Sequence, residues 1–527
     1  MGDTHQFIEG RDIFASDMQQ QDAISEITTS FQNTTFFITG GTGFIGKIFL
    51  EKLLRISKTV KVLILVRPKK DKNTLERFQE IFEGPNMVPL KLANPHFMKQ
   101  IRLISGNCYE KNLGLSAEDK QMLIDEVNYV IHCAATVNFD EDLKTAAYIN
   151  VRAVKDLIGM AKQMKDLRAF LHVSTAYSHC YRKFIDESFY EVAMRGEDLL
   201  HMVESMDQKR LDAITPQLIK EWPNTYVFTK AIAEDVIKNE SGRLPIAILR
   251  PSIVLSSVSE PLAGWIDSFY GLTGMLMAVT LGFMRVFRVK SKNKGDLIPA
   301  DYVTNAGFGI LWDLSKTRSL NDNIEFPSGD IKEDVTIYNA VSSAESPIVW
   351  DRMLQLLLKE GLKIPSPYQI WYPLWISVTN PYIFTILSLL LQTIPAYLMD
   401  FICYCMGKQQ RMVKGYRKLE KFSSVTNYFS LREWQFSNKN LQALWKKLEP
   451  EDQRLFKFSM KNFDWKGYVF FYIRGFRVYL LKDPLETVPK GKAWMRWLKA
   501  MHYTSVLLLS FLALTLLYNM YKFCLSS

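Results

Sequence analysis

Two side chains that could handle a proton stand four residues apart in the stretch WPNTYVFTKAIAE, from Trp222 to Glu234. They are Tyr226 and Lys230, and this spacing puts both on one face of a helix. A free phenol has a pKa of about 10, and a nearby ammonium group favours its ionised form. The pair therefore predicts a tyrosine that exchanges a proton with a substrate oxygen. The segment alone leaves open the alternative, an exposed turn of an ordinary helix.

Two hydroxyl side chains upstream could act on the same oxygen. The β-rich run AFLHVSTAYS, at 169–178, contains Ser174 and Thr175 where the strand is expected to end. In open parallel sheets, ligands bind at the carboxyl ends of the strands. A hydroxyl group there can donate a hydrogen bond to a carbonyl oxygen as that oxygen gains negative charge. Ser174 or Thr175 is therefore predicted to polarise a substrate carbonyl.

A glycine turn near the N-terminus predicts a dinucleotide site. Gly40, Gly43 and Gly46 are spaced three apart, between a β-rich run at 36–39 and an amphipathic helix at about 47–54. In a dinucleotide fold these glycines permit a tight turn, a close approach of backbone to the pyrophosphate, and packing of helix on strand. The N–H groups of the helix N-terminus then face the phosphates. The other residues predicted to line this turn are Thr42, Phe44 and Ile45. The alternative is a purely structural glycine turn.

The next β-rich run, at 60–66, is followed by Arg67-Pro68-Lys69-Lys70. An NAD site would present Asp or Glu here for the ribose 2′-hydroxyl, whereas a cation suits the 2′-phosphate of NADP. NADPH is therefore the predicted cofactor, bound by Arg67 with help from Lys69 or Lys70. The positive ring of the oxidised cofactor would further favour the Tyr226 phenolate. A solvated basic loop is the alternative interpretation.

The elements that would position these residues alternate between strand and helix. Further β-rich runs occupy 101–108, 128–139 and 169–178, and helical stretches occupy 116–126 and 142–165. Small residues, Ala134-Ala135, lie in the second of these runs, where a cofactor would come close. Such alternation predicts an α/β fold with a doubly wound, Rossmann-type parallel sheet.

Length and composition bound the function. A chain of 527 residues predicts more than one structural unit, and residues 1–30 read as a loose polar tail. The net charge of +10 would suit nucleic acid, anionic lipid or a polyanionic small molecule, and no nucleic-acid motif is present. Six scattered cysteines predict neither a disulfide framework nor a metal site, which indicates a reducing, cytosol-facing protein.

Two apolar stretches point to a membrane. Residues 503–521 are uncharged and long enough to span a bilayer, and 486–502 form a basic linker that keeps the preceding chain in the cytosol. A buried core helix is the alternative. Residues 364–399 also lack charge, but their five prolines are expected to break regular helix. That segment is an interfacial hairpin, an acyl-chain tunnel or plain core.

The motifs together resemble the alcohol-forming fatty acyl-CoA reductases, within the extended short-chain dehydrogenase/reductase superfamily. The resembling blocks are FITGGTGFIGK, LVRPKK, HVSTAY, WPNTYVFTKAIAE, LRPSIV and DLIPADYVTN. The resemblance continues through KFSMKNFDWKGYVFFYIRGFRVYLLKD, at 457–483, which is similar to the C-terminal domain of that family. It covers nearly all of the chain from about residue 34 to residue 485.

The resemblance implies roles for individual residues. Tyr226 is the proton donor, Lys230 binds the nicotinamide ribose, and Thr175 is preferred over Ser174 because it directly precedes Ala176. The cofactor pocket would also include Cys133, Ala134, Ala135 and Pro251. Asn107 stands where the family usually has Asp, and its amide oxygen can still accept from adenine. Asn150 would hold the lysine through water, or is a surface residue of a helix.

The sequence thus predicts a membrane-anchored reductase that converts long-chain fatty acyl-CoA to a primary alcohol with NADPH. Expected units are the tail at 1–30, a reductase domain at 31–345, a C-terminal domain at 346–485, the linker and the anchor. A peroxisomal or endoplasmic reticulum membrane would fit, and a homodimer is open. The alternatives are a sterol-type or sugar-nucleotide dehydrogenase of the same superfamily, or a non-catalytic NADPH-binding scaffold on a membrane.

Overall fold

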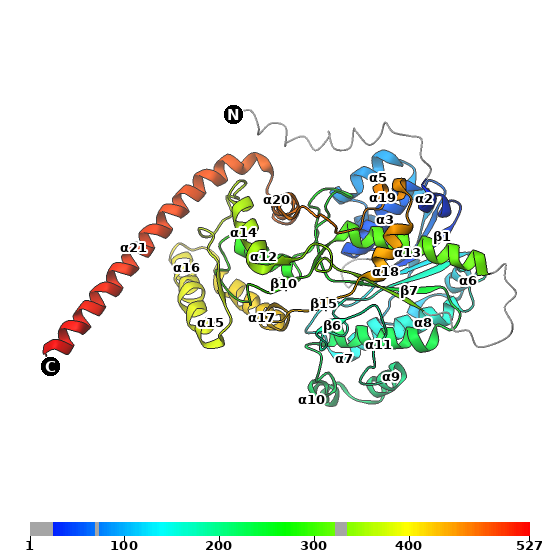
Figure 1. Cartoon of the computed structure of the whole chain (residues 1–527), viewed down its shortest axis with the longest axis horizontal. Helices are drawn as coiled ribbons and strands as arrows, with labels where there is room; N and C mark the ends of the chain where they lie inside the picture. Colours follow the sequence, from blue (N-terminus) through cyan, green and yellow to red (C-terminus); the bar gives the residue numbers. More distant parts are fainter. Residues whose placement is uncertain (1–24, 69–72, 322–334, 527) are drawn as a thin grey trace.

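A seven-stranded parallel sheet organises the computed structural model, which describes residues 25–68, 73–321 and 335–526 (Figure 1). The strand order is β12-β7-β5-β4-β1-β2-β3, and every neighbouring pair is parallel. The strands are β1 (Thr35–Thr39), β2 (Lys61–Val66), β3 (Ile101–Ser105), β4 (Tyr129–His132), β5 (Ala169–Val173), β7 (Ile246–Pro251) and β12 (Thr336–Ala340). The predicted doubly wound α/β fold is therefore confirmed.

The strands read as short apolar runs because helices cover both faces of the sheet. Every residue of β4 and β5 is buried, and only the first residue of β1 is partly exposed. The order of strands reverses between β1 and β4, so the carboxyl ends of β1, β4 and β5 border the crevice where such sheets bind ligands.

Helices form a layer on each face (Figure 1). One face carries α3 (Phe44–Ile56), α5 (Val88–Ala93) and α13 (Ala300–Asn321), whose side chains share a core with Phe36 and Ile38. The other carries α6 (Ala117–Glu126), α7 (Leu143–Ala147), α8 (Ala153–Ala161) and α11 (Thr225–Glu240). The remaining N-terminal helices are α4 (Thr74–Ile81), α9 (Gly196–Ser205) and α10 (Gln208–Leu218).

Residues beyond 346 complete the same core. Strand β15 (Gln435–Phe436) pairs with β6 (Phe184–Ile185), and α18 (Lys439–Lys447) and α19 (Pro450–Leu455) precede Phe456, which packs with Phe308 of α13. Helices α12 (Leu272–Thr280), α14 (Trp350–Gly361) and α20 (Trp465–Gly475) share a second apolar cluster. The predicted boundary between 345 and 346 is thus bridged by packing on both sides.

One apolar helix runs from Pro381 to Cys405, contrary to the expectation that proline would interrupt it. It consists of α15 (Pro381–Ser388), a π-helical turn at Leu389–Thr393, and α16 (Ile394–Cys405). Pro381 lies in the first turn, where its missing N–H costs nothing. Pro395 cannot donate to the carbonyl of Leu391, but the Arg285 guanidinium does so at 2.7 Å. A π-turn and one long-range bond therefore carry the helix past the proline.

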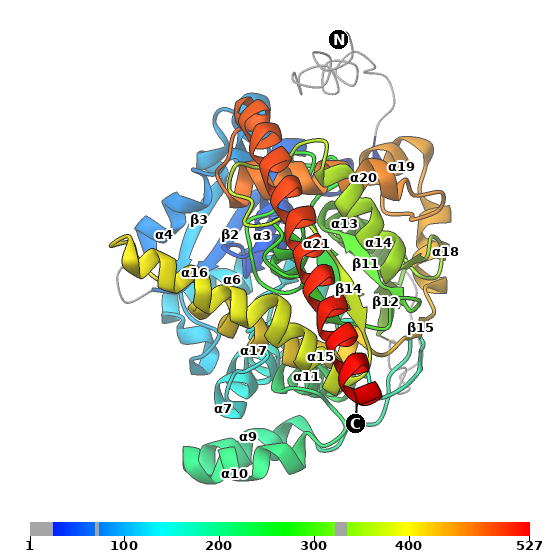
Figure 2. The same ribbon diagram turned by 90° about the vertical axis from the view of Figure 1, so that its left-hand side faces the viewer.

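The C-terminal helix α21 (Val488–Ser526) leaves the body near Tyr372, whose ring stacks on His502 at 5.6 Å. Its apolar part is exposed, and both α21 and the 381–405 helix lie at the same end of the molecule (Figures 1 and 2). Each is long and apolar enough to be a candidate membrane span. Within the predicted tail at 1–30, residues Glu26–Ser30 form helix α2, with Ile27 fully buried, so this part is packed.

Candidate active site

The glycine turn lies at the carboxyl end of β1 and fits a dinucleotide. Gly40 has a φ of +77°, and a Cβ there would come within 2.5 Å of the backbone nitrogen of Ala134, beyond β4. A Cβ on Gly46 would lie 2.2 Å from the carbonyl oxygen of Gly40. Gly43 caps α3 without a side-chain hydrogen bond and is exposed. The turn therefore presents free N–H groups of a helix N-terminus, as a pyrophosphate site requires.

The other predicted residues of the turn, Thr42, Phe44 and Ile45, are partly exposed. The ring of Phe44 packs against Trp265, with centroids 5.3 Å apart, so part of its surface is used within the protein. Thr42 and Ile45 stay at the open side of the turn beside Gly43. The three side chains surround the N-terminus of α3, as the sequence analysis expects.

Arg67 lies exposed at the end of β2, beside a second arginine that the sequence analysis did not include. Arg77, on α4, donates to the backbone oxygen of Arg67, and burial together with the neighbouring Arg67 lowers the pKa of Arg77. Two guanidinium groups thus gather where a 2′-phosphate would bind. The predicted helpers, Lys69 and Lys70, fall outside the described residues.

The remaining predicted cofactor residues have mixed placements. Cys133, Ala134 and Ala135 follow β4 and are partly exposed beside the glycine turn, with the Cys133 thiol donating to the oxygen of Thr39 at 3.0 Å. The amide oxygen of Asn107 already accepts the N–H of Tyr109 at 3.1 Å, which leaves one lone pair for a ligand. Pro251 is buried, and its carbonyl oxygen accepts the N–H of Ala176 at 2.9 Å.

Tyr226 and Thr175 meet at the carboxyl end of β5. Tyr226 lies in the first turn of α11, which begins where Asn224 accepts the N–H of Val227 at 3.1 Å. Burial raises the pKa of Tyr226 to about 12, and a side-chain hydrogen bond with Thr175 opposes that rise. The expectation of a lowered phenol pKa is therefore not met, because burial is the larger influence. A phenol with this pKa is fully protonated near neutral pH.

Lys230 lies one turn further along α11 and is fully buried. Its ammonium group donates to the carbonyl oxygen of Val173, the last residue of β5, at 2.7 Å. Burial lowers the pKa of Lys230 to about 8, and the Glu234 carboxylate is the strongest influence that raises it. The lysine therefore holds its charge at neutral pH through a residue on its own helix.

Ser174 faces away from Tyr226 in its bonding. Its hydroxyl donates to Glu234 at 2.5 Å, and Glu234 also accepts two bonds from Arg250, at 3.0 and 2.6 Å. The paired Arg250 holds the pKa of the Glu234 carboxyl well below its usual range, and His179 adds to that effect. The structure therefore leaves Thr175, rather than Ser174, beside the Tyr226 hydroxyl.

Glu234 and Arg250 were missed by the sequence analysis, although a signal exists. Tyr226, Lys230 and Glu234 follow one another at intervals of four on α11, so they form one stripe along the helix. Arg250 lies in the last turn of β7, in the LRPSIV block. Because both members are almost fully buried, this ion pair fixes α11 against the sheet.

Asn150 is only 1% exposed, which excludes the surface-residue interpretation. It lies in a π-helical turn (Tyr148–Arg152) between α7 and α8. Its amide nitrogen donates to the hydroxyl of Thr229 at 2.9 Å, and its oxygen accepts the N–H of Thr136 at 3.0 Å. Asn150 therefore joins the loop after β4 to the residue that precedes Lys230.

Comparison with known proteins identifies the family. The family described as "Male sterility protein" matches residues 38–307, and a second domain of the same description matches 391–483. The chain is 38% identical over 492 residues to "Fatty acyl-CoA reductase wat" of Drosophila melanogaster, with 93% of each chain covered. It is 34% identical over 474 residues to "Fatty acyl-CoA reductase 1" of Homo sapiens, with 90% of each covered.

Among solved structures, the reductase domain of a nonribosomal peptide synthetase from Mycobacterium tuberculosis matches with a TM-score of 0.52 at 16% identity. The match covers 89% of this chain and 99% of that one, and it shows a shared fold. The resemblance inferred from the sequence blocks is confirmed by these relatives. The chain belongs to the fatty acyl-CoA reductase family.

Proposed function

We propose that this protein reduces long-chain fatty acyl-CoA to a primary alcohol, with NADPH as the cofactor. The observation that carries the proposal is the position of Tyr226, Thr175 and Lys230 at the carboxyl end of β5, across from the glycine turn, in a member of this family. When bound, NADPH would supply a hydride for each of two reductions. Free CoA thiol leaves after the first and the alcohol after the second.

The chain's own residues would bind and orient the cofactor. The space that a Cβ would fill at Gly40 and Gly46 is needed for the tight turn, so backbone approaches the pyrophosphate there. Arg67 and Arg77 would pair with the 2′-phosphate, which favours NADPH over NADH. No acidic residue stands at Arg67, where NAD would need a partner for its ribose hydroxyl.

The same residues would then handle the proton in both steps. Thr175 donates a hydrogen bond to the thioester oxygen, and Tyr226 gives its proton to that oxygen as hydride reaches the carbon. Collapse of the resulting hemithioacetal breaks the carbon–sulfur bond, and the thiolate that leaves takes up a proton. In the second step Tyr226 protonates the aldehyde oxygen, and the cation of Lys230 stabilises the phenolate left behind.

We further propose that α21 anchors the protein in an intracellular membrane, peroxisomal or endoplasmic reticulum, with the catalytic part in the cytosol. Support comes from the apolar residues 503–521, whose side chains are exposed, and from the basic residues before them. Those basic residues are Lys490, Lys492, Arg496 and Lys499.

The test uses membranes that carry the full chain. They receive palmitoyl-CoA with either NADPH or NADH, and free thiol, oxidised cofactor and lipid products are measured. The proposal predicts hexadecanol, two NADPH oxidised per thiol released, and much weaker turnover with NADH. Membranes with Tyr226→Phe are the matched control and should release no thiol. Thiol release without alcohol, or no thiol release at all, would contradict the proposal.

A further inference from the structure

An exposed apolar face runs along the helix from Pro381 to Cys405. Tyr382, Phe401 and Tyr404 expose 78%, 63% and 67% of their surface. The opposite side is bonded to the body, where the side-chain oxygen of Gln392 accepts the N–H of Arg285 at 2.9 Å. Such a helix is held on one side, so its free side can lie on a membrane surface at the end of the molecule where α21 emerges (Figure 2).

Helix α17 (Met412–Ser430) connects this apolar helix to the catalytic tyrosine. At its start, the Asp400 carboxylate on α16 accepts the N–H groups of residues 411, 412 and 413, at 2.9–3.0 Å. At its end, Phe429 lies 6.1 Å from Phe139, whose ring stacks on Tyr226 at 5.8 Å. One rigid element thus reaches from the presumed lipid-facing surface to the reaction site.

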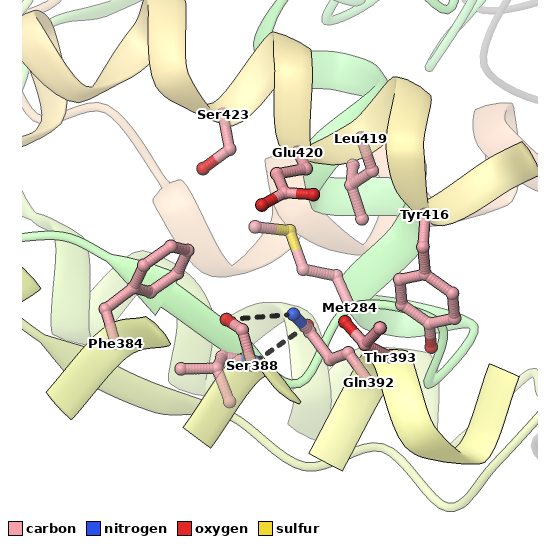
Figure 3. Close-up of a pocket in the computed structure, with 10 residues that line it drawn as sticks. Met284, Phe384, Ser388, Gln392, Thr393, Tyr416, Leu419, Glu420 and Ser423 are labelled. Carbon is pink, nitrogen blue, oxygen red and sulfur yellow. Dashed lines mark hydrogen bonds between the residues drawn. The ribbon is translucent and has the colours of Figure 1, made fainter. Parts of the chain in front are cut away.

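Three pockets follow one another along this connection. The outer pocket, of about 380 Å³, lies between α17 and the 381–405 helix (Figure 3). The middle pocket, of about 250 Å³, lies beside α12 and α14, and the inner pocket, of about 300 Å³, is bounded by Tyr177 and Phe429. Met284 lines both the outer and the middle pocket, and Trp350 lines both the middle and the inner one. Each junction is therefore a single side chain.

The chemistry of the walls suits a hydrocarbon chain. The middle pocket has only apolar or aromatic side chains: Leu272, Met275, Leu276, Val279, Met284, Phe287, Val289, Trp350, Leu354 and Trp375. Phe429, Trp434 and Phe436 dominate the wall of the inner pocket. The outer pocket is mixed, because the exposed Glu420 and the buried Ser423 face it from α17 (Figure 3). Methionine adapts readily to different shapes, so Met284 can open the junction beside it.

We propose that these pockets bind the acyl chain of the substrate, with its thioester at Tyr226 and its far end at Met284 and beyond, under the 381–405 helix. The proposal rests on the proposed function and adds the place of the hydrocarbon chain. Each methylene that leaves water for such a wall gains about 0.8 kcal/mol, so a long chain is held mainly by this path. An alcohol product would leave through the outer pocket into the bilayer.

The direct test is photo-crosslinking of the full chain in membranes. A palmitoyl-CoA analogue with a diazirine at the terminal methyl end should label peptides that contain Phe384 or Leu419. An analogue with the diazirine near the thioester should label the peptide that contains Phe429. Labelling by the terminal probe elsewhere, and not at these two segments, would overturn the proposal.

A variant supplies an independent reading. Met284→Trp fills the junction of the outer and middle pockets, so the ratio of kcat/KM for palmitoyl-CoA to that for octanoyl-CoA should fall about tenfold, as the loss of two buried methylenes predicts. Met98→Trp, at a residue 44% exposed that lines none of these pockets, is the matched control and should leave the ratio unchanged. An unchanged ratio in Met284→Trp would contradict the path.

A second variant covers the case in which tryptophan prevents folding. Met284→Ala enlarges the same junction and should raise the ratio of kcat/KM for docosanoyl-CoA to that for palmitoyl-CoA. A ratio equal to that of the wild type would count against the path. Failure of the proposed function is distinguishable, because the wild-type protein would then release thiol from no acyl-CoA of any length.

Discussion

Replacing Glu234 with glutamine would lower the pH at which Lys230 loses its charge. Glu234 is 1% exposed and accepts bonds from Ser174 and Arg250. Burial lowers the pKa of Lys230 to about 8, and Glu234 is the main group that opposes this fall. Without the carboxylate charge, burial acts with less opposition. The pKa of Lys230 should therefore fall further.

The size of the effect follows from the helix geometry. Residues four apart on a helix have Cβ atoms roughly 5–6 Å apart, and two unit charges at about 6 Å interact by about 3 kcal/mol at an effective dielectric of about 20. Arg250 neutralises part of the Glu234 charge, so we expect about half of that energy, or about one pKa unit. A lysine loses its charge as pH rises through its pKa, so activity that needs the ammonium should fall near pH 7 in the variant, about one unit lower than in the wild type.

The assay is the pH dependence of kcat/KM for acyl-CoA reduction, from about pH 6 to about pH 10. Tyr226 does not interfere, because its pKa is raised to about 12 and it stays protonated throughout this range. Glu260→Gln is the matched control, since Glu260 also pairs with two cations, Lys52 at 2.5 Å and Arg55 at 3.3 Å. Both variants should lose stability, by about 3–5 kcal/mol for a fully buried pair, but only Glu234→Gln should move the alkaline limb. A limb that stays in place or moves to higher pH would refute the reasoning.

Four further outcomes are expected. Tyr226→Phe should reduce turnover by roughly 10²–10⁴-fold while NADPH binding, measured by fluorescence titration, is retained. Gly46→Ala should abolish NADPH binding, because its Cβ would lie 2.2 Å from a carbonyl oxygen, whereas Gly159→Ala, with nothing within 4 Å, should bind normally. Arg67→Ala should lower the preference for NADPH over NADH about tenfold in kcat/KM, since one charged hydrogen bond to phosphate is lost. Removal of residues 503–527 should release the protein from carbonate-washed membranes, with its turnover kept.

Much of the cofactor site could be predicted because its constraints are local. Gly40 and Gly46 occupy positions where neighbouring backbone leaves no room for a side chain, and such a demand is visible as spacing in the sequence. Tyr226 and Lys230 are visible for a similar reason, since one helix positions both. The strand order also follows from alternation of strand and helix with short connections.

The parts that could not be predicted depend on contacts between distant segments. Ser174, Glu234 and Arg250 come from a strand end, a helix and another strand, and only the folded chain brings them together. That contact decides between the two hydroxyls, because it occupies Ser174 and leaves Thr175 beside Tyr226. Likewise, the helix continues past Pro395 because Arg285, more than a hundred residues earlier, bonds to the carbonyl that the proline leaves unpaired.

The central claim is that Tyr226 and Thr175 serve two hydride transfers to the same acyl carbon. It is tested most directly with palmitoyl-CoA and NADPH that carries deuterium at the transferable position, followed by mass spectrometry of the lipid product. We predict hexadecanol with two deuterium atoms at C1, absent in Tyr226→Phe. Product with one deuterium at C1, or deuterated product formed equally well by Tyr226→Phe, would contradict the account.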